Sequence, residues 1–216
     1  MIKFKLKNAG NILIPIFLLL FFVGYFRGFS LLAAFVPKAV IYIALLIIWV
    51  VLMREYIIKG IRSFKKEYIN DALSAAVIML AASGAVSLIA SRLGSDMLEN
   101  GSPSDAPLLL MLFSSLIYAP VVEELINRGA LFLILEKWIR NTLAINILCA
   151  ALFSFMHLFK MQADPAALFL FGLIYFMLGF VCGRFYLKTN NIILAVLIHF
   201  LWNLFTVAGY VLRTVI

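Results

Sequence analysis

The chain is built largely from apolar runs that are long enough to cross a lipid bilayer. A bilayer core is about 30 Å thick and needs about 20 apolar residues per helix, and such runs follow one another along most of the sequence. Hydrophobic residues make up 65% of the 216 residues and charged residues 13%, against about 45–50% and about 25% in soluble domains. Because one soluble core could not bury so much apolar surface, the sequence predicts an integral membrane protein.

The apolar runs predict an all-α, polytopic bundle of about seven transmembrane helices, which forms a single domain over residues 1–216. Residues that favour helix N-termini precede several of these runs: Asn70-Asp71, Asn141-Thr142, Asn190-Asn191 and Asp164-Pro165. We interpret the first run as a retained helix, because no small-residue cleavage pattern follows it. The predicted helices are 10–26, 31–53, 71–91, 107–136, 142–160, 165–187 and 191–213.

The basic residues are divided unequally between the two predicted sides of the membrane. If the N-terminus is inside, only Arg27, Lys38, Arg92, Lys160 and Arg213 of the 18 Lys and Arg residues fall outside. Loops rich in Lys and Arg stay in the cytoplasm, so we expect a cytoplasmic N-terminus. The short chain suggests a bacterial plasma membrane. A net charge of +8 without interleaved aromatic and basic residues gives no reason to expect a nucleic-acid partner.

Two adjacent glutamates and an arginine interrupt the fourth predicted helix. Charged residues inside a bilayer are costly and usually functional. Glu124 and Arg128 are four residues apart with the acid first, which is the favoured order for a helical ion pair. Glu123 lies about 100° around the helix without that partner, and suits a general base. Alternatively, the helix ends at Val122 and the charges lie at the membrane surface, although an apolar run resumes at Gly129–Leu135.

Both histidines of the chain lie within predicted helices. Phe153 and His157 are four residues apart, as are His199 and Asn203, so each pair shares one helix face. A single histidine in a membrane helix is often only hydrogen-bonded to a neighbouring helix. Two histidines, a pair of glutamates and an asparagine on three helices instead predict one shared polar site.

Two mechanisms fit these residues. In the first, Glu123 and His157 deprotonate a water that attacks a peptide carbonyl, while His199 and Asn203 donate hydrogen bonds to the oxyanion. In the second, Glu123, His157 and His199 bind zinc, which leaves one position for the nucleophilic water. An H-E-x-x-H motif is absent from the sequence, so nothing local requires a metal. The expected cofactor is therefore either zinc or none.

Three motifs in order, E-E-x-x-x-R at 123–128, F-x-x-x-H at 153–157 and H-x-x-x-N at 199–203, resemble the CPBP intramembrane peptidase family. That family includes the type II CAAX prenyl endopeptidases and the bacteriocin self-immunity proteins. The resemblance covers about residues 107–210, and no motif position departs from the pattern. It implies a helical membrane fold whose site lies in an intramembrane cavity.

The resemblance also implies a role for each matching residue. Glu123 would be the catalytic base, and Glu124, which we also place in the catalytic set, would support it together with Arg128. His157 would share in water activation, and His199 with Asn203 would form the oxyanion side. The second motif would add Phe153 as a supporting residue.

These observations predict an intramembrane endopeptidase that cleaves a membrane-associated peptide or protein, with the lipid bilayer and that substrate as its partners. The alternative is a non-catalytic membrane regulator or immunity protein that binds partner proteins through the same helices. A third class, a small transporter that uses the buried charges as an ion relay, lacks the paired repeats common among transporters.

The predicted helix boundaries conflict with a compact site. They place Glu123 near the middle of the bilayer, His199 toward the inner side and His157 within about one turn of the outer end. A tilted fifth helix, or one that continues past Lys160, would bring the three side chains to one depth.

Overall fold

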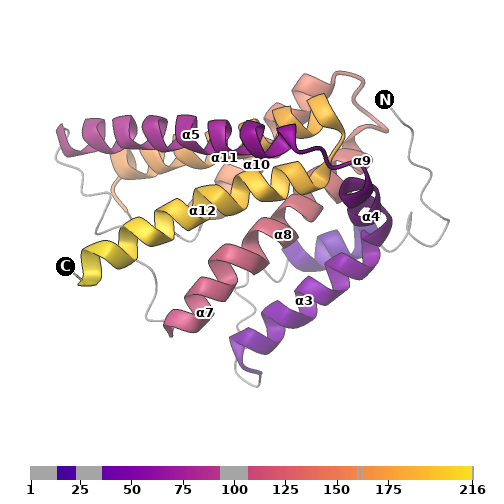
Figure 1. The fold of residues 1–216 in the computed structure, drawn as a ribbon, viewed down its shortest axis with the longest axis horizontal. Helices are drawn as coiled ribbons and strands as arrows, with labels where there is room; N and C mark the ends of the chain where they lie inside the picture. Colours follow the sequence, from indigo (N-terminus) through magenta and orange to yellow (C-terminus); the bar gives the residue numbers. More distant parts are fainter. Residues whose placement is uncertain (1–13, 23–35, 93–106, 160, 162, 216) are drawn as a thin grey trace.

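The computed structural model is a bundle in which the described residues form helices and no strands (Figure 1). The structure describes residues 14–22, 36–92, 107–159, 161 and 163–215. Residues 14–22 are helical. After them come α3 (Lys38–Leu52), α4 (Arg54–Arg62), α5 (Glu67–Arg92), α7 (Leu108–Phe113), η1 (Ser114–Tyr118), α8 (Ala119–Glu124), η2 (Leu125–Leu131), α9 (Phe132–Leu135), α10 (Thr142–Leu158), α11 (Pro165–Thr189) and α12 (Ile192–Val215). The all-α prediction is confirmed for this part of the chain.

Four of these helical segments are long and apolar enough to cross a membrane: α5, the continuous run Leu108–Leu135, α11 and α12. A fifth candidate is α3 together with α4, which are bent by 71° relative to each other. Helix α10 has 17 residues, about 26 Å, which is short for a bilayer core. The described residues thus support an integral membrane protein with four or five candidate spans. The predicted number of seven is not confirmed.

Several predicted helix ends are confirmed by caps. The side-chain oxygens of Asn141, Asp164 and Asn191 each accept a hydrogen bond from a backbone N–H in the first turn of the helix that follows. Such bonds satisfy donors that a helix start leaves without partners. The amide nitrogen of Asn191 also donates to the Gly60 carbonyl at 2.8 Å, so this cap of α12 holds α4 in place.

Other predicted boundaries are wrong. Pro37 lies outside α3 with a ψ of 138°, so this helix begins later than the predicted residue 31; residues 31–35 lie outside the described part. The predicted cap at Asn70-Asp71 is also wrong, because α5 already begins at Glu67. The interval 54–70, predicted as a loop, contains α4.

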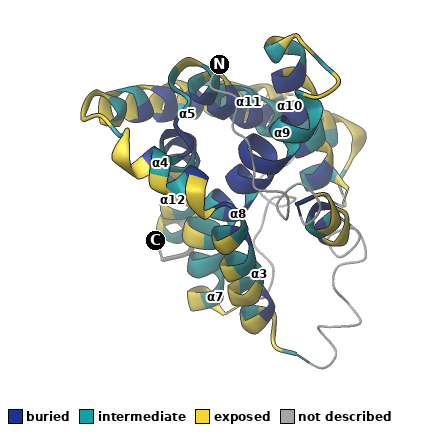
Figure 2. Ribbon diagram, turned by 90° about the vertical axis from the view of Figure 1, so that its right-hand side faces the viewer, coloured by how far each residue is buried: buried dark blue, intermediate teal, exposed yellow. Residues whose placement is uncertain are grey.

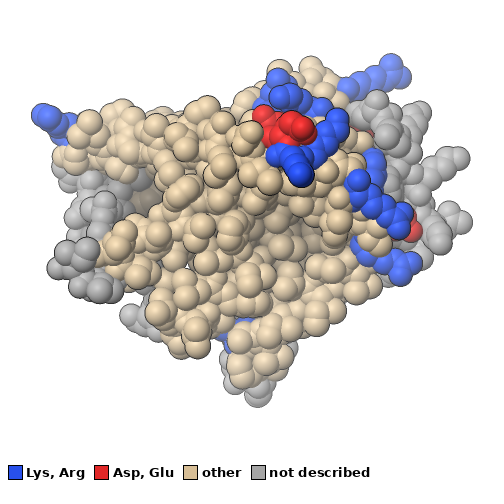
Figure 3. Space-filling view, viewed as in Figure 1, with Lys and Arg blue, Asp and Glu red and all other residues tan. Residues whose placement is uncertain are grey.

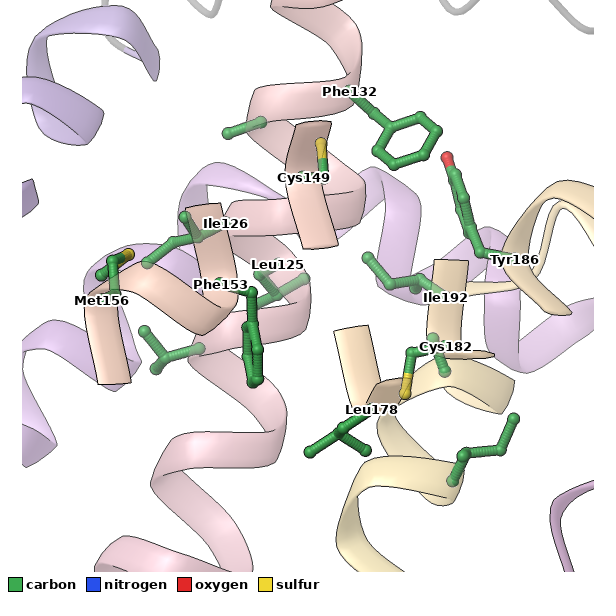
Figure 4. Packing of buried hydrophobic residues seen from close by; sticks show 14 of the residues in the cluster. Leu125, Ile126, Phe132, Cys149, Phe153, Met156, Leu178, Cys182, Tyr186 and Ile192 are labelled. Carbon is green, nitrogen blue, oxygen red and sulfur yellow. The ribbon is translucent and has the colours of Figure 1, made fainter. Parts of the chain in front are cut away.

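The run from α7 to α9 is the central element of the bundle. Helices α5, α11 and α12 lie side by side, and α7–α9 crosses them obliquely (Figure 1). Burial is deepest where α8 continues into η2 (Figure 2), and every residue from Glu124 to Ala130 is buried. Apolar side chains of η2, α10 and α11 surround this point, including Leu125, Phe153 and Leu178 (Figure 4). Buried polar groups here are therefore enclosed by protein.

Helices α10 and α11 pack closely through Gly179 and Gly183 of α11. A Cβ atom at Gly179 would lie 3.0 Å from the Cα of Ala150, and one at Gly183 would overlap the side chain of Asn146. Asn146 is fully buried and donates to the Phe180 carbonyl at 3.1 Å. Such glycines permit membrane helices to approach each other closely, and α10 and α11 do so here.

Replacing Gly183 with alanine should lower the free energy of unfolding in detergent by about 1–3 kcal/mol, because the new methyl group would overlap the fully buried side chain of Asn146. Gly84→Ala is the matched control, since nothing lies within 4 Å of a Cβ at Gly84. The control should be neutral or stabilising by up to about 1 kcal/mol. Equal unfolding energies for the two variants would contradict this packing.

Candidate active site

A π-helical turn before the glutamates links the central helix to Asn203. In η1 the N–H of Ala119 donates to the Ser114 carbonyl, and the next residue, Pro120, has no N–H to donate. The Ser115 carbonyl therefore loses both of its ordinary helical donors. The side-chain nitrogen of Asn203 on α12 donates to that carbonyl at 2.7 Å. This bond fixes one turn of α12 beside the turn that precedes Glu123.

Glu124 is the centre of a buried charge network. Its Oε1 atom lies 3.1 Å from Nη1 of Arg128 and 3.0 Å from Nδ1 of His199. Arg128 also donates from Nη2 to the Gly179 carbonyl on α11, and both Glu124 and Arg128 are fully buried. The predicted ion pair is confirmed. The alternative in which the helix ends at Val122 is excluded, because helical structure continues to Leu135.

Glu123 points toward both histidines. Its Oε2 atom lies 3.8 Å from Nε2 of His157 on α10 and 3.9 Å from Nε2 of His199 on α12. This oxygen is buried and has no hydrogen-bond partner in the protein. The three side chains therefore meet, although α10 ends at Leu158. The segments that carry them, α8, α10 and α12, converge here despite the conflict in the predicted helix boundaries.

The hydrogen bonds of the two imidazoles define which nitrogen carries a proton. Nδ1 of His157 lies 2.9 Å from the Phe153 carbonyl, an acceptor only, so this nitrogen carries the hydrogen. Nδ1 of His199 likewise donates to Glu124, whose carboxylate is paired with Arg128. In the neutral form of each ring the Nε2 lone pair consequently faces Glu123.

Aromatic rings hold His157 in position. Its ring centroid lies 4.2 Å from that of Tyr175 with nearly parallel planes, and 4.5 Å from that of Phe153. The centroid of the Phe153 ring also lies 5.7 Å from that of His199. The Arg128 guanidinium lies 6.0 Å from the centroid of the Phe153 ring. Phe153 is thus in contact with both imidazoles and with the guanidinium of the ion pair.

A cavity of about 450 Å³ opens beside these groups. Glu123, His157, His199 and Asn203 line it, whereas Glu124 does not. The remaining lining residues come mainly from residues 38–42, 114–119 and 203–207. The residues predicted from the sequence are therefore brought together. Glu124 does not line the cavity itself but contacts His199, which does.

Some residues of the site were not among those predicted from the sequence. Asn127 donates from its side chain to the Glu123 carbonyl at 2.8 Å and so fixes the backbone of that residue. Tyr175 stacks on His157, and the carbonyls of Ser115 and Gly179 accept the bonds described above. The polar residue Asn127 in the middle of an apolar run was the one detectable hint.

The spacing of the three nearest ligand candidates does not match a zinc site. Zinc ligands lie about 2.0–2.2 Å from the ion, so two ligand atoms of a tetrahedral site are about 3.3–3.6 Å apart. The Oε2 atom of Glu123 lies farther than this from the Nε2 atoms of both histidines, at 3.8 and 3.9 Å. Among the described residues, no group of three or more His, Cys, Asp or Glu side chains has metal-site geometry. A water molecule about 2.8 Å from each partner fits the observed separations.

Comparison with known proteins gave one match. Residues 105–205 match the family model described as Type II CAAX prenyl endopeptidase Rce1-like. No curated protein and no solved structure matches the chain. The matched region contains all three predicted motifs, and the family is a protease family. Residues 105–205, which hold the polar cluster and most of the cavity wall, are therefore similar to the type II CAAX prenyl endopeptidase Rce1-like family.

Proposed function

We propose that this chain is an intramembrane endopeptidase that hydrolyses a peptide bond in a membrane-associated peptide or protein. The observation that carries the proposal is the position of Glu123 Oε2, 3.8 and 3.9 Å from the Nε2 atoms of the two histidines. An unpartnered carboxylate oxygen at a cavity wall, facing two imidazoles, has the arrangement needed to hold and deprotonate water.

In the first step, water bound between Glu123 and His157 loses a proton to Glu123. The resulting hydroxide forms a bond to the carbonyl carbon of the substrate. The proton then passes to the amide nitrogen, the carbon–nitrogen bond breaks, and an acid and an amine leave. Positioned general bases of this kind accelerate proton transfer about 10²–10⁴-fold, and Tyr175 and Phe153 support the step by fixing the His157 ring.

On the other side of the carbonyl, His199 and Asn203 stabilise the oxyanion. His199 can donate from Nε2 only when both of its nitrogens are protonated, because Nδ1–H already faces Glu124. The Glu124 carboxylate stabilises that cation, in the same way that a buried aspartate stabilises the imidazolium of a serine protease. The side-chain amide of Asn203 lines the same cavity and supplies the second donor.

We assign Glu124 and Arg128 a positioning role. Glu124 was predicted within the catalytic set, but it contacts His199 and Arg128 and does not line the cavity. Arg128 compensates its charge and, through Gly179, connects the site to α11. The pair therefore acts on the reaction through the orientation and charge of His199.

We also propose that the end of the bundle around α4 faces the cytoplasm. Lys and Arg side chains gather over α4 and the beginning of α5 (Figure 3), including Arg54, Arg62, Lys65 and Lys66, all of them exposed. Basic residues concentrate on the cytoplasmic side of membrane proteins. This agrees with the predicted orientation, in which the N-terminus is inside.

The proposal is tested with purified full-length protein in liposomes and a library of apolar peptides in ¹⁸O-labelled water. Mass spectrometry should detect new peptide C-termini that carry one ¹⁸O atom, because water supplies the new oxygen. If the wild-type chain cleaves no peptide and the Glu123→Ala strain keeps the phenotype of the wild-type strain, the endopeptidase proposal is wrong.

A further inference from the structure

Helix α4 is held against α12 by one of its faces. Tyr56 and Gly60 on this face are buried, and a Cβ atom at Gly60 would lie 2.8 Å from the side chain of Ile193. The side-chain nitrogen of Asn191, a fully buried residue, donates to the Gly60 carbonyl at 2.8 Å and to the Ser63 hydroxyl at 3.1 Å. These contacts fix the rotation of α4 about its axis, so they define which of its side chains point away from the protein.

The side of α4 that faces away from α12 carries apolar and positive side chains together. Ile58 and Ile61 are 45% and 60% exposed and lie about 60° apart around the helix. Ile58 is four residues after Arg54 and four before Arg62, and both arginines are exposed, so the three side chains share one stripe. Lipid chains would cover the isoleucines, while the long arginine side chains extend their guanidinium groups to the level of the headgroups.

The positive charge of this segment is not compensated within the protein. Residues 54–66 contain five Lys and Arg residues and a single acid, Glu55; the next acids, Glu67 and Asp71, lie on α5. Lys59 is one turn after Glu55, the order that favours a helical ion pair, so these two charges offset each other. In the described part of the chain, no acidic side chain forms an ion pair with the other four basic residues, Arg54, Arg62, Lys65 and Lys66.

The bend between α3 and α4 directs this face along the membrane surface. The two helices are bent by 71° relative to each other, so if α3 crosses the bilayer, α4 runs nearly parallel to its surface. The exposed arginines disfavour a path through the hydrocarbon core. A helix that lies in the interface with an apolar and a basic side is typical of segments that bind anionic lipid.

We propose that α4 lies in the headgroup region of the cytoplasmic leaflet and is a docking surface for anionic phospholipids. Arg54 and Arg62 contact lipid phosphate groups, and Ile58 and Ile61 contact the upper parts of the acyl chains. Charge complementarity selects this partner, because the negative surface of the cytoplasmic leaflet attracts basic residues next to a membrane span. The inference takes its leaflet from the proposed orientation and is independent of the proposed peptidase activity.

The test measures which lipids surround α4. The full-length Ile61→Cys protein is labelled with an NBD fluorophore, since the native Cys149 and Cys182 are fully buried. It is placed in nanodiscs of phosphatidylcholine with phosphatidylglycerol as the minor lipid. In two matched preparations, the same mole fraction of either phosphatidylglycerol or phosphatidylcholine carries a nitroxide near the headgroup end of an acyl chain. NBD quenching in the two preparations gives the local ratio of anionic to neutral lipid.

We expect NBD emission typical of an apolar environment and a local ratio about three- to tenfold above that of the whole nanodisc, within the range of two exposed ion pairs. The double change Arg54→Gln with Arg62→Gln should remove most of this enrichment, and Arg54→Lys with Arg62→Lys should retain it. Arg92→Gln, at an exposed position at the other end of α5, should leave it unchanged. A label at Val77→Cys, 59% exposed in the middle of α5, should report the ratio of the whole nanodisc.

A label at residue 61 that shows water-like emission and is quenched by neither lipid overturns the proposal, because this face would then be open to water or to a soluble partner. The same local lipid ratio at residues 61 and 77 overturns it as well, because α4 would then have no preference for anionic lipid. An enrichment that survives Arg54→Gln with Arg62→Gln removes the two arginines as its cause and also overturns the proposal.

Discussion

Replacing Glu123 with glutamine should lower the rate of peptide hydrolysis by about 10²–10⁴-fold, the contribution expected of a positioned general base. The amide has nearly the same size as the carboxylate but accepts no proton from water. Fold and peptide affinity should stay close to those of the wild type, because Glu123 Oε2 makes no hydrogen bond in the protein. The rate is measured under single-turnover conditions in liposomes.

The matched control for this change is Glu67→Gln, at the exposed beginning of α5. It should retain the wild-type rate. Equal rates for the wild type and Glu123→Gln would remove Glu123 from the reaction. If a cellular phenotype also survives Glu123→Gln, the same helices act as a non-catalytic regulator.

Replacing Arg128 with methionine should destabilise the protein by about 3–5 kcal/mol, because it leaves the carboxylate of Glu124 buried without its cation. It also removes the donor to the Gly179 carbonyl, which connects the central helix to α11. The measurement is chemical unfolding in detergent, followed by the fluorescence of the buried Trp49 and Trp202.

Two further variants separate the charge effect from a general loss of packing. Arg62→Met, at an exposed site on α4, should change the unfolding energy by no more than about 0.5 kcal/mol. The double change Glu124→Gln with Arg128→Met should recover at least half of the lost stability, because it removes the uncompensated charge. An Arg128→Met protein as stable as Arg62→Met would contradict the buried ion pair.

Local spacing in the sequence was enough to predict the pairs that lie on one helix. The i,i+4 rule predicted the ion pair of Glu124 and Arg128, and the predicted caps Asn141, Asp164 and Asn191 depend only on neighbouring residues. The free-energy cost of placing a charged side chain in lipid indicated that Glu123, Glu124 and Arg128 needed partners within the protein. These inferences use short-range geometry, which the sequence determines directly.

Contacts between helices could not be predicted in the same way. The stacking of Tyr175 on His157 and the bond from Arg128 to the Gly179 carbonyl depend on how α10 and α11 pack against the central run. The bond from Asn203 to Ser115 depends on a π-helical turn, and no residue pattern in the sequence specified that turn. The apolar pattern also did not reveal the bend between α3 and α4, because composition alone does not define where a helix changes direction.

We propose that Glu123 and His157 hold one reacting water molecule and that His199 faces the oxyanion, without a metal ion between the three groups. The most direct test is the metal content of detergent-purified protein that is actively cleaving a peptide, measured together with its rate in a zinc chelator. We expect well below one zinc ion per chain and an unchanged rate in the chelator. One zinc ion per chain, with activity lost in the chelator and restored by added zinc, would contradict this proposal.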